Sequence, residues 1–78
     1  MRLDANNPFH KDVAMFIDVL LDGEKVEKAC IADTDFGEVH VYTGAVKNGE
    51  AEIDIKKGVV TLRGRTQFTQ AWLLVNGY

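Results

Sequence analysis

The residues best suited to chemistry lie in one short stretch, DTDFGEVHVY at 33–42, which holds two aspartates, a glutamate and a histidine. Such a group could bind a calcium or zinc ion, or exchange protons with a substrate. A calcium loop of the EF-hand type needs glycine at its sixth position and a carboxylate at its twelfth. Counted from Asp33, glycine falls at the fifth position and the twelfth is Gly44, so the pattern fails. We therefore interpret residues 33–38 as a turn in which the carboxylates, Asp33 and Asp35, accept hydrogen bonds from backbone N–H groups.

Histidine and cysteine are the remaining candidates for metal or nucleophilic chemistry. Zinc needs three or four ligands at an organised spacing, whereas Cys30, His10 and His40 form neither a C-x-x-C nor an H-x-x-x-H arrangement. We interpret Cys30 as a small buried apolar side chain and His40 as an exposed or partly covered residue of a strand. The chain contains no serine and no glycine-rich phosphate-binding motif. The sequence thus predicts no catalytic residue, metal site or cofactor, and no enzymatic activity.

The basic side chains of the second half are candidates for binding nucleic acid. Residues 1–46 hold four basic and nine acidic side chains, a net charge of −5, whereas residues 47–78 hold five basic and three acidic, a net charge of +2. Small barrels that bind single strands combine a basic groove with stacking aromatic side chains. The alternative function is therefore a small-barrel nucleic-acid-binding protein with a basic face in residues 47–65, formed by Lys56, Lys57, Arg63 and Arg65. The net charge of −3 disfavours this alternative, because phosphate contacts dominate such affinity.

The elements that must position these residues are predicted to be short antiparallel strands. Glycines at near-regular spacing, most of them preceded by a polar residue, separate short apolar or alternating runs. This spacing is typical of a mainly β meander that closes as a small barrel or folds as a sandwich. With 78 residues the chain forms a single domain. Residues 1–12 are expected to be an irregular or short helical lead-in, with a helical turn near 7–11, and residues 13–78 a β-rich core.

The pairing that the sequence favours most is a hairpin about Lys57 and Gly58. Four aliphatic side chains would share one face of this hairpin: Ile53, Ile55, Val60 and Leu62. On the other face Glu52 would oppose Arg63 with the opposite charge. A slip of one residue would break both relationships, so the register is self-consistent.

A second hairpin is predicted about Asn48 and Gly49, joining the segment EVHVYTGAV to the segment AEIDI. A two-residue turn there directs Val39 and Val41 away from the core. A three-residue turn, or a bulge at Gly44, would return both valines to the core.

Two segments, residues 9–21 and 67–76, are compatible with either a strand or a helix. We favour a strand for 14–21, because this segment contains β-branched residues and leads into an Asp-Gly turn. The segment 67–76 is too apolar to lie bare on a monomer in either conformation. Four side chains of this tail are predicted to form a protein interface: Phe68, Trp72, Leu74 and Tyr78.

The run DVLLDGEKVEKACIADTDFGEVHVYTG resembles a pattern found in small bacteriophage and prophage proteins of uncharacterised function. In those proteins a V-x-L-D-G-x-x-V hairpin leads to a cysteine-containing strand, an acidic D-T-D-x-G turn and a strand that ends in V-Y. The resemblance covers about residues 17–44. It implies a small β protein encoded by a phage near structural genes, and it implies no catalytic residues.

These observations together predict a non-enzymatic β module that acts by protein–protein association. The expected partner is the chain itself, as a homo-oligomer, or another protein, in a structural, assembly or host-interacting role. The longest apolar run, interrupted by Asp18, spans nine residues and is too short to cross a bilayer. The chain is accordingly expected to be soluble, either in the cytoplasm of a host cell or incorporated in a virion.

Overall fold

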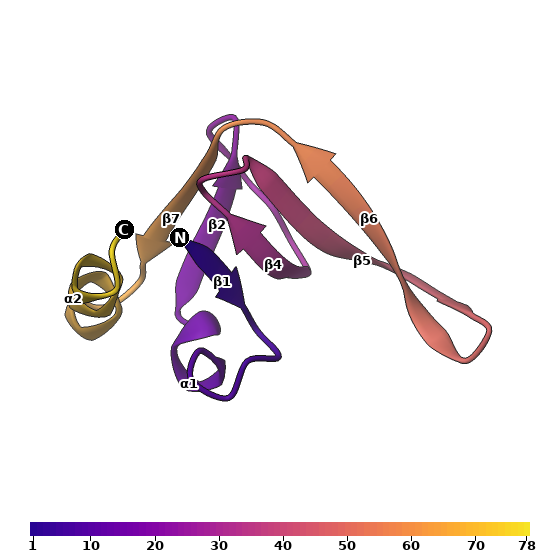
Figure 1. Cartoon of the computed structure of the whole chain (residues 1–78), viewed down its shortest axis with the longest axis horizontal. Helices are drawn as coiled ribbons and strands as arrows, with labels where there is room; N and C mark the ends of the chain where they lie inside the picture. Colours follow the sequence, from indigo (N-terminus) through magenta and orange to yellow (C-terminus); the bar gives the residue numbers. More distant parts are fainter.

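The computed structural model, which describes residues 1–78, contains two open antiparallel sheets (Figure 1). The larger sheet has the strand order β1-β4-β5-β6: β1 (Arg2–Asp4), β4 (Ala29–Asp33), β5 (Glu38–Lys47) and β6 (Glu50–Lys57). The smaller sheet has the order β3-β2-β7: β3 (Glu24–Lys25), β2 (Ile17–Leu21) and β7 (Val60–Gly64). The helices are α1 (Lys11–Ala14) and α2 (Gln67–Val75). The prediction of a mainly β antiparallel fold is confirmed, and the strands form two open sheets and no closed barrel.

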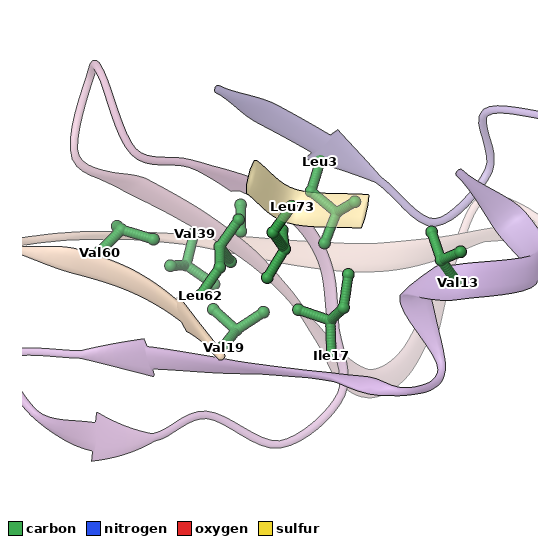
Figure 2. Packing of buried hydrophobic residues seen from close by; sticks show 9 residues of the cluster. Leu3, Val13, Ile17, Val19, Val39, Val60, Leu62 and Leu73 are labelled. Atoms are coloured by element: carbon green, nitrogen blue, oxygen red, sulfur yellow. The ribbon is translucent and has the colours of Figure 1, made fainter. Parts of the chain in front are cut away.

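The hydrophobic core lies between the two sheets and is covered at one side by α2. Figure 2 shows apolar side chains that converge from both sheets and both helices. The core residues are Leu3, Val13, Ile17, Val19, Ala32, Val39, Val60, Leu62 and Leu73. Val39 and Leu73 are completely buried. The strand β6 contributes no side chain to this core, which distinguishes it from every other long strand.

The predicted hairpin about Lys57 and Gly58 is wrong, because the strands on its two sides belong to different sheets. In β6, Ile55 pairs with His40 of β5, whereas in β7, Leu62 pairs with Val19 of β2. The four aliphatic residues assigned to one face are accordingly separated: Ile53 and Ile55 are exposed, and Val60 and Leu62 are buried. The predicted pairing of Glu52 with Arg63 is not formed either.

Gly58 is the point at which the chain crosses from one sheet to the other. Its N–H donates to the carbonyl oxygen of Gly37 at 3.0 Å. A Cβ atom at Gly58 would lie 2.7 Å from a carboxylate oxygen of Asp22. That carboxylate accepts a hydrogen bond from the N–H of Val59 at 2.9 Å. Glycine is therefore needed at this position for a close crossing of segments rather than for a chain reversal.

The predicted hairpin about Asn48 and Gly49 is confirmed. Both residues have positive φ, +54° and +78°, as a two-residue turn of the I′ type requires. The register of β5 against β6 shifts between Tyr42 and Val46, at the bulge expected near Gly44. Val39 is buried in the core, and Val41 is half-buried.

The two ambiguous segments adopt different structures. Residues 17–21 form the strand β2, as favoured, and the turn Asp22-Gly23 returns the chain to β3. A single helical turn lies at Lys11–Ala14, later in the chain than the expected 7–11. The tail is helical: Thr66 caps α2, with its side chain accepting from the N–H of Thr69, and the helix ends before Gly77 at φ +90°.

Candidate interaction surfaces

The acidic segment 33–38 is a turn built around one buried carboxylate. Asp33 Oδ1 accepts hydrogen bonds from the N–H groups of Asp35 and Phe36, each at 2.9 Å. Its other oxygen accepts from Arg2 Nη1 at 3.2 Å. These bonds, that from Phe36 first, lower the pKa of Asp33 below its ordinary value of 3.8. The interpretation of this stretch as a turn is confirmed, with Asp33 accepting the backbone hydrogen bonds that close it. For Asp35 the prediction is wrong, because its carboxylate contacts the amino group of Met1 at 2.7 Å.

The side chains of the two histidines and the cysteine make separate contacts, although Cys30 lies beside the backbone of His40. Cys30 Sγ is buried and donates to the carbonyl oxygen of His40 at 3.3 Å. His40 Nε2 lies 3.4 Å from a carboxylate oxygen of Glu38. His10 accepts from the N–H of Asp4, and its ring packs edge-on against Trp72 with the centroids 5.5 Å apart. Nowhere do three or more His, Cys, Asp or Glu side chains converge as metal ligands.

The basic residues proposed for nucleic acid do not form one surface. Arg63 lies on β7 of the smaller sheet and Arg65 directly after it, and both contact Asp18, at 3.4 and 2.7 Å, where Lys25 also lies at 3.6 Å. The hydrogen bond from Arg65 is the main cause of the lowered pKa of Asp18. Lys57, on β6 of the larger sheet, lies 3.8 Å from a Glu38 oxygen. Three of the four cations are therefore already paired with carboxylates of the same chain.

The tail residues predicted to form an interface have two different roles in the structure. Phe68 and Leu74 are 70 % and 65 % exposed and lie on the outer side of α2. Trp72 is half-buried against His10. The hydroxyl of Tyr78 accepts a hydrogen bond from the N–H of Leu62 at 2.9 Å. Phe68 and Leu74 are free for contact, whereas Trp72 and Tyr78 attach the helix to the body.

The tail also protects the outer edge of β7. The N–H of Leu62 donates to Tyr78, and the N–H of Gly64 donates to Gln70 Oε1 at 3.0 Å. These two donors are on alternate residues of an edge strand, so they would otherwise face outward without a partner. Side chains from the segment that follows thus satisfy the edge of the smaller sheet.

We call the hairpin of β5 and β6 the arm, and its outer half carries the surface that sequence reasoning missed. Figure 1 shows the arm projecting away from the rest of the molecule. All of residues 43–57 are exposed. Tyr42 lies opposite Ile53, and Val46 lies opposite Ala51, so these four side chains share one face. With Ile55 they form what we call the arm face. The alternation in AEIDI was a signal for this face, and it was wrongly assigned to the core.

The outer edge of β6 is bare. This strand has eight residues and is hydrogen bonded only to β5. No other hydrogen bond of the chain involves the backbone of residues 50–57. The other edge strands are either short, as β1 and β3 are, or capped, as β7 is. The outer half of β5, residues 43–47, has no partner other than β6, but it is shorter and is interrupted by the register shift near Gly44. β6 is therefore the longest bare edge that can add a further strand.

An open pocket of about 300 Å³ lies between β2, β3 and β4. Its apolar wall includes Ile17 and Cys30, and its polar groups are dominated by Asp18 with Arg65 and Lys25. Asp18, Arg65 and Lys25 are paired with one another, whereas Lys11 and Lys28, which also line the pocket, take part in no ion pair. Nothing in the lining singles out one kind of ligand, so the pocket is a weaker candidate than the arm.

Neither helix is long and apolar enough to pass through a lipid bilayer. No family model, no curated protein and no solved structure matches this chain.

Proposed function

We propose that this chain is a non-enzymatic module that acts by associating with protein through the arm. The observation that carries the proposal is the exposure of the arm face, where Ile53 and Ile55 are 45 % and 53 % exposed. A strand that alternates apolar and charged residues normally buries its apolar half. The chain leaves about half of each isoleucine in contact with water, and contact with another protein surface would release that water.

The stability of the folded chain does not explain why the arm is present. A two-stranded ribbon outside the core is marginal in water, and ordering each residue costs conformational entropy. Residues 43–57 contribute no side chain to the hydrophobic core in return. A binding role supplies the contacts that would offset this cost.

The exposed side of α2 extends the proposal to a second contact. Phe68 and Leu74 lie on a helix without a single charged residue. The resemblance of residues 17–44 to small phage and prophage proteins supports a role in virion assembly or in binding a host protein. Under this proposal the module acts in the host cytoplasm or within a virion.

Site-specific photo-crosslinking tests the role of the arm. A photoreactive benzoylphenylalanine replaces Ile53 in the arm face, and in a matched control it replaces Phe36, which is 80 % exposed in the acidic turn. We expect ultraviolet light to produce protein adducts from position 53, with the purified chain or in bacterial cells. The control should give few adducts. Equal yields at both positions, or none at position 53, would contradict the proposal.

A further inference from the structure

We infer that the partner of the arm is a second copy of this chain, paired antiparallel along the outer edges of the two β6 strands. The inference rests on the proposed function and names its partner. It begins from the contrast between the edges: the outward donors of β7 are capped by Tyr78 and Gln70, and those of β6 have no partner. A backbone edge of eight residues is satisfied most completely by another strand.

In one antiparallel register, the side chains of β6 are complementary to those of β6 in a second copy. A two-fold axis perpendicular to the sheet keeps each side chain on its own face, so residues of the same parity must oppose one another. With the axis at Asp54, Glu52 of one copy opposes Lys56 of the other, and this ion pair occurs twice. On the arm face Ile53 opposes Ile55 of the other copy, also twice. Opposed pairs of these kinds are the stabilising contacts of a sheet.

The charges needed for this pairing are free in the single chain. Neither Glu52 nor Lys56 takes part in an ion pair within the chain, whereas the neighbouring Lys57 is engaged with Glu38. The only like-charged pair is Asp54 with its own copy at the axis. Moving the axis to Ile53 would instead oppose Glu52 and Asp54 twice, which is less favourable.

The alternative axis at Ile55 forms two Asp54–Lys56 ion pairs, but it pairs only residues 53–57 of β6 and places Ile53 against Lys57. The register centred on Asp54 pairs residues 51–57, and it is the only one of the three that combines two ion pairs with two isoleucine pairs. It joins two four-stranded sheets into one sheet of eight strands, and the two isoleucine pairs partly cover each other. Because each copy uses its longest bare edge and the contact is two-fold symmetric, the assembly closes as a dimer.

Charge exchange tests this register by sedimentation equilibrium at low salt. We expect Glu52→Lys alone, or Lys56→Glu alone, to weaken dimerisation by roughly tenfold or more, since two attractive pairs become repulsive. The double variant Glu52→Lys/Lys56→Glu should restore the affinity to within about threefold. Glu50→Lys is the matched control, because that residue would oppose Gly58 and lose no ion pair.

Disulfide trapping provides an independent measurement. Residues opposed across an antiparallel pair have Cα atoms about 4.5–5.5 Å apart, a separation that a disulfide can bridge. Asp54→Cys should therefore form a covalent dimer under mild oxidation, and Glu50→Cys should not. The native Cys30 is buried and does not compete.

The outcomes separate this inference from the proposed function. A dimer that is unaffected by charge reversal and is not trapped at position 54 would show pairing elsewhere and overturn the inference. A strictly monomeric chain whose position 53 crosslinks to a different protein would also overturn it, while the proposed function would stand. No adduct at position 53 would remove both.

Discussion

Arg65 Nε donates a hydrogen bond to Asp18 Oδ1 over 2.7 Å, and this contact ties the residue after β7 to the middle of the smaller sheet. The backbone N–H of Arg65 also donates to the carbonyl oxygen of Phe16 at 2.8 Å. Arg63 and Lys25 also form ion pairs with this carboxylate. The arginines that the sequence offered for phosphate binding are used to balance a buried acid.

Acid should destabilise the protein through two carboxylates. The pKa values of Asp18 and Asp33 are both below 3.8 in the folded chain. Their stabilising effect is therefore complete above the unfolded-state pKa and is lost as the pH falls through the folded-state pKa. We expect the urea midpoint to fall steeply below about pH 4. Asp18→Asn should lower the midpoint at pH 7 and flatten this acid limb.

The control for that experiment is Asp12→Asn, which changes an exposed aspartate without an ion pair. It should leave both the midpoint and the acid limb as they are. A wild-type midpoint that does not change between pH 5 and pH 2 would contradict the assignment of Asp18 and Asp33.

Gly64→Ala should displace α2. A Cβ atom at position 64 would lie 2.4 Å from the backbone nitrogen of Gln70 and 2.8 Å from its Cα, and the helix backbone cannot rotate away as a side chain can. We expect a loss of about 1–3 kcal/mol in the free energy of unfolding, as for other overpacked contacts. Urea titration followed by Trp72 fluorescence would measure it. Thr61→Ala, exposed on the same strand, is the control, and an equal effect of both would contradict the prediction.

Thr69→Val should destabilise the protein although the side chain keeps its shape. Thr69 is 1 % exposed, and its hydroxyl accepts a hydrogen bond from the N–H of Thr66 at 3.1 Å and lies 3.2 Å from the carbonyl oxygen of Phe16, to which it can donate. Removing the hydroxyl leaves the N–H of Thr66 without its acceptor, at a cost of about 1–3 kcal/mol. Thermal unfolding by circular dichroism measures the loss. The exposed Thr61→Val should change stability little, and a neutral Thr69→Val would show that the hydroxyl is dispensable.

Hydrogen exchange should divide the arm into two regions. Amides of residues 43–53 lie outside the core, so local opening should expose them far more often than the amides around Val39. We expect their protection factors in dilute protein to be at least about a hundredfold lower. At high protein concentration, protection should rise in β6 and stay constant in Val39. Uniform protection along β5 would contradict this division.

Local turn chemistry was predictable from the sequence, and long-range pairing was not. Asn48-Gly49 and Asp22-Gly23 supply positive φ wherever they occur, so both hairpins could be placed. The partner of β7 is β2, about forty residues away, and no neighbouring residue indicates it. The sequence did not decide between a helix and a strand for residues 67–76, because their apolar residues fit the repeat of either element.

The interaction surfaces were also only partly predictable from the sequence. Alternation in β6 correctly placed Ile53 and Ile55 on one face, but a pattern does not reveal whether the chain itself covers that face. Of the four tail residues predicted to form an interface, Phe68 and Leu74 are exposed, whereas Trp72 and Tyr78 make contacts within the fold. Which side chains remain available depends on contacts that only the assembled structure defines.

The packing of the interior does not depend on how far the ribbon of β5 and β6 extends. Trimming or lengthening it symmetrically beyond Tyr42 would leave every core side chain where it is. The requirement to fold therefore does not fix that length. Under the proposed function the partner sets it, and chains with longer or shorter ribbons would share one core and differ in the assemblies that they form.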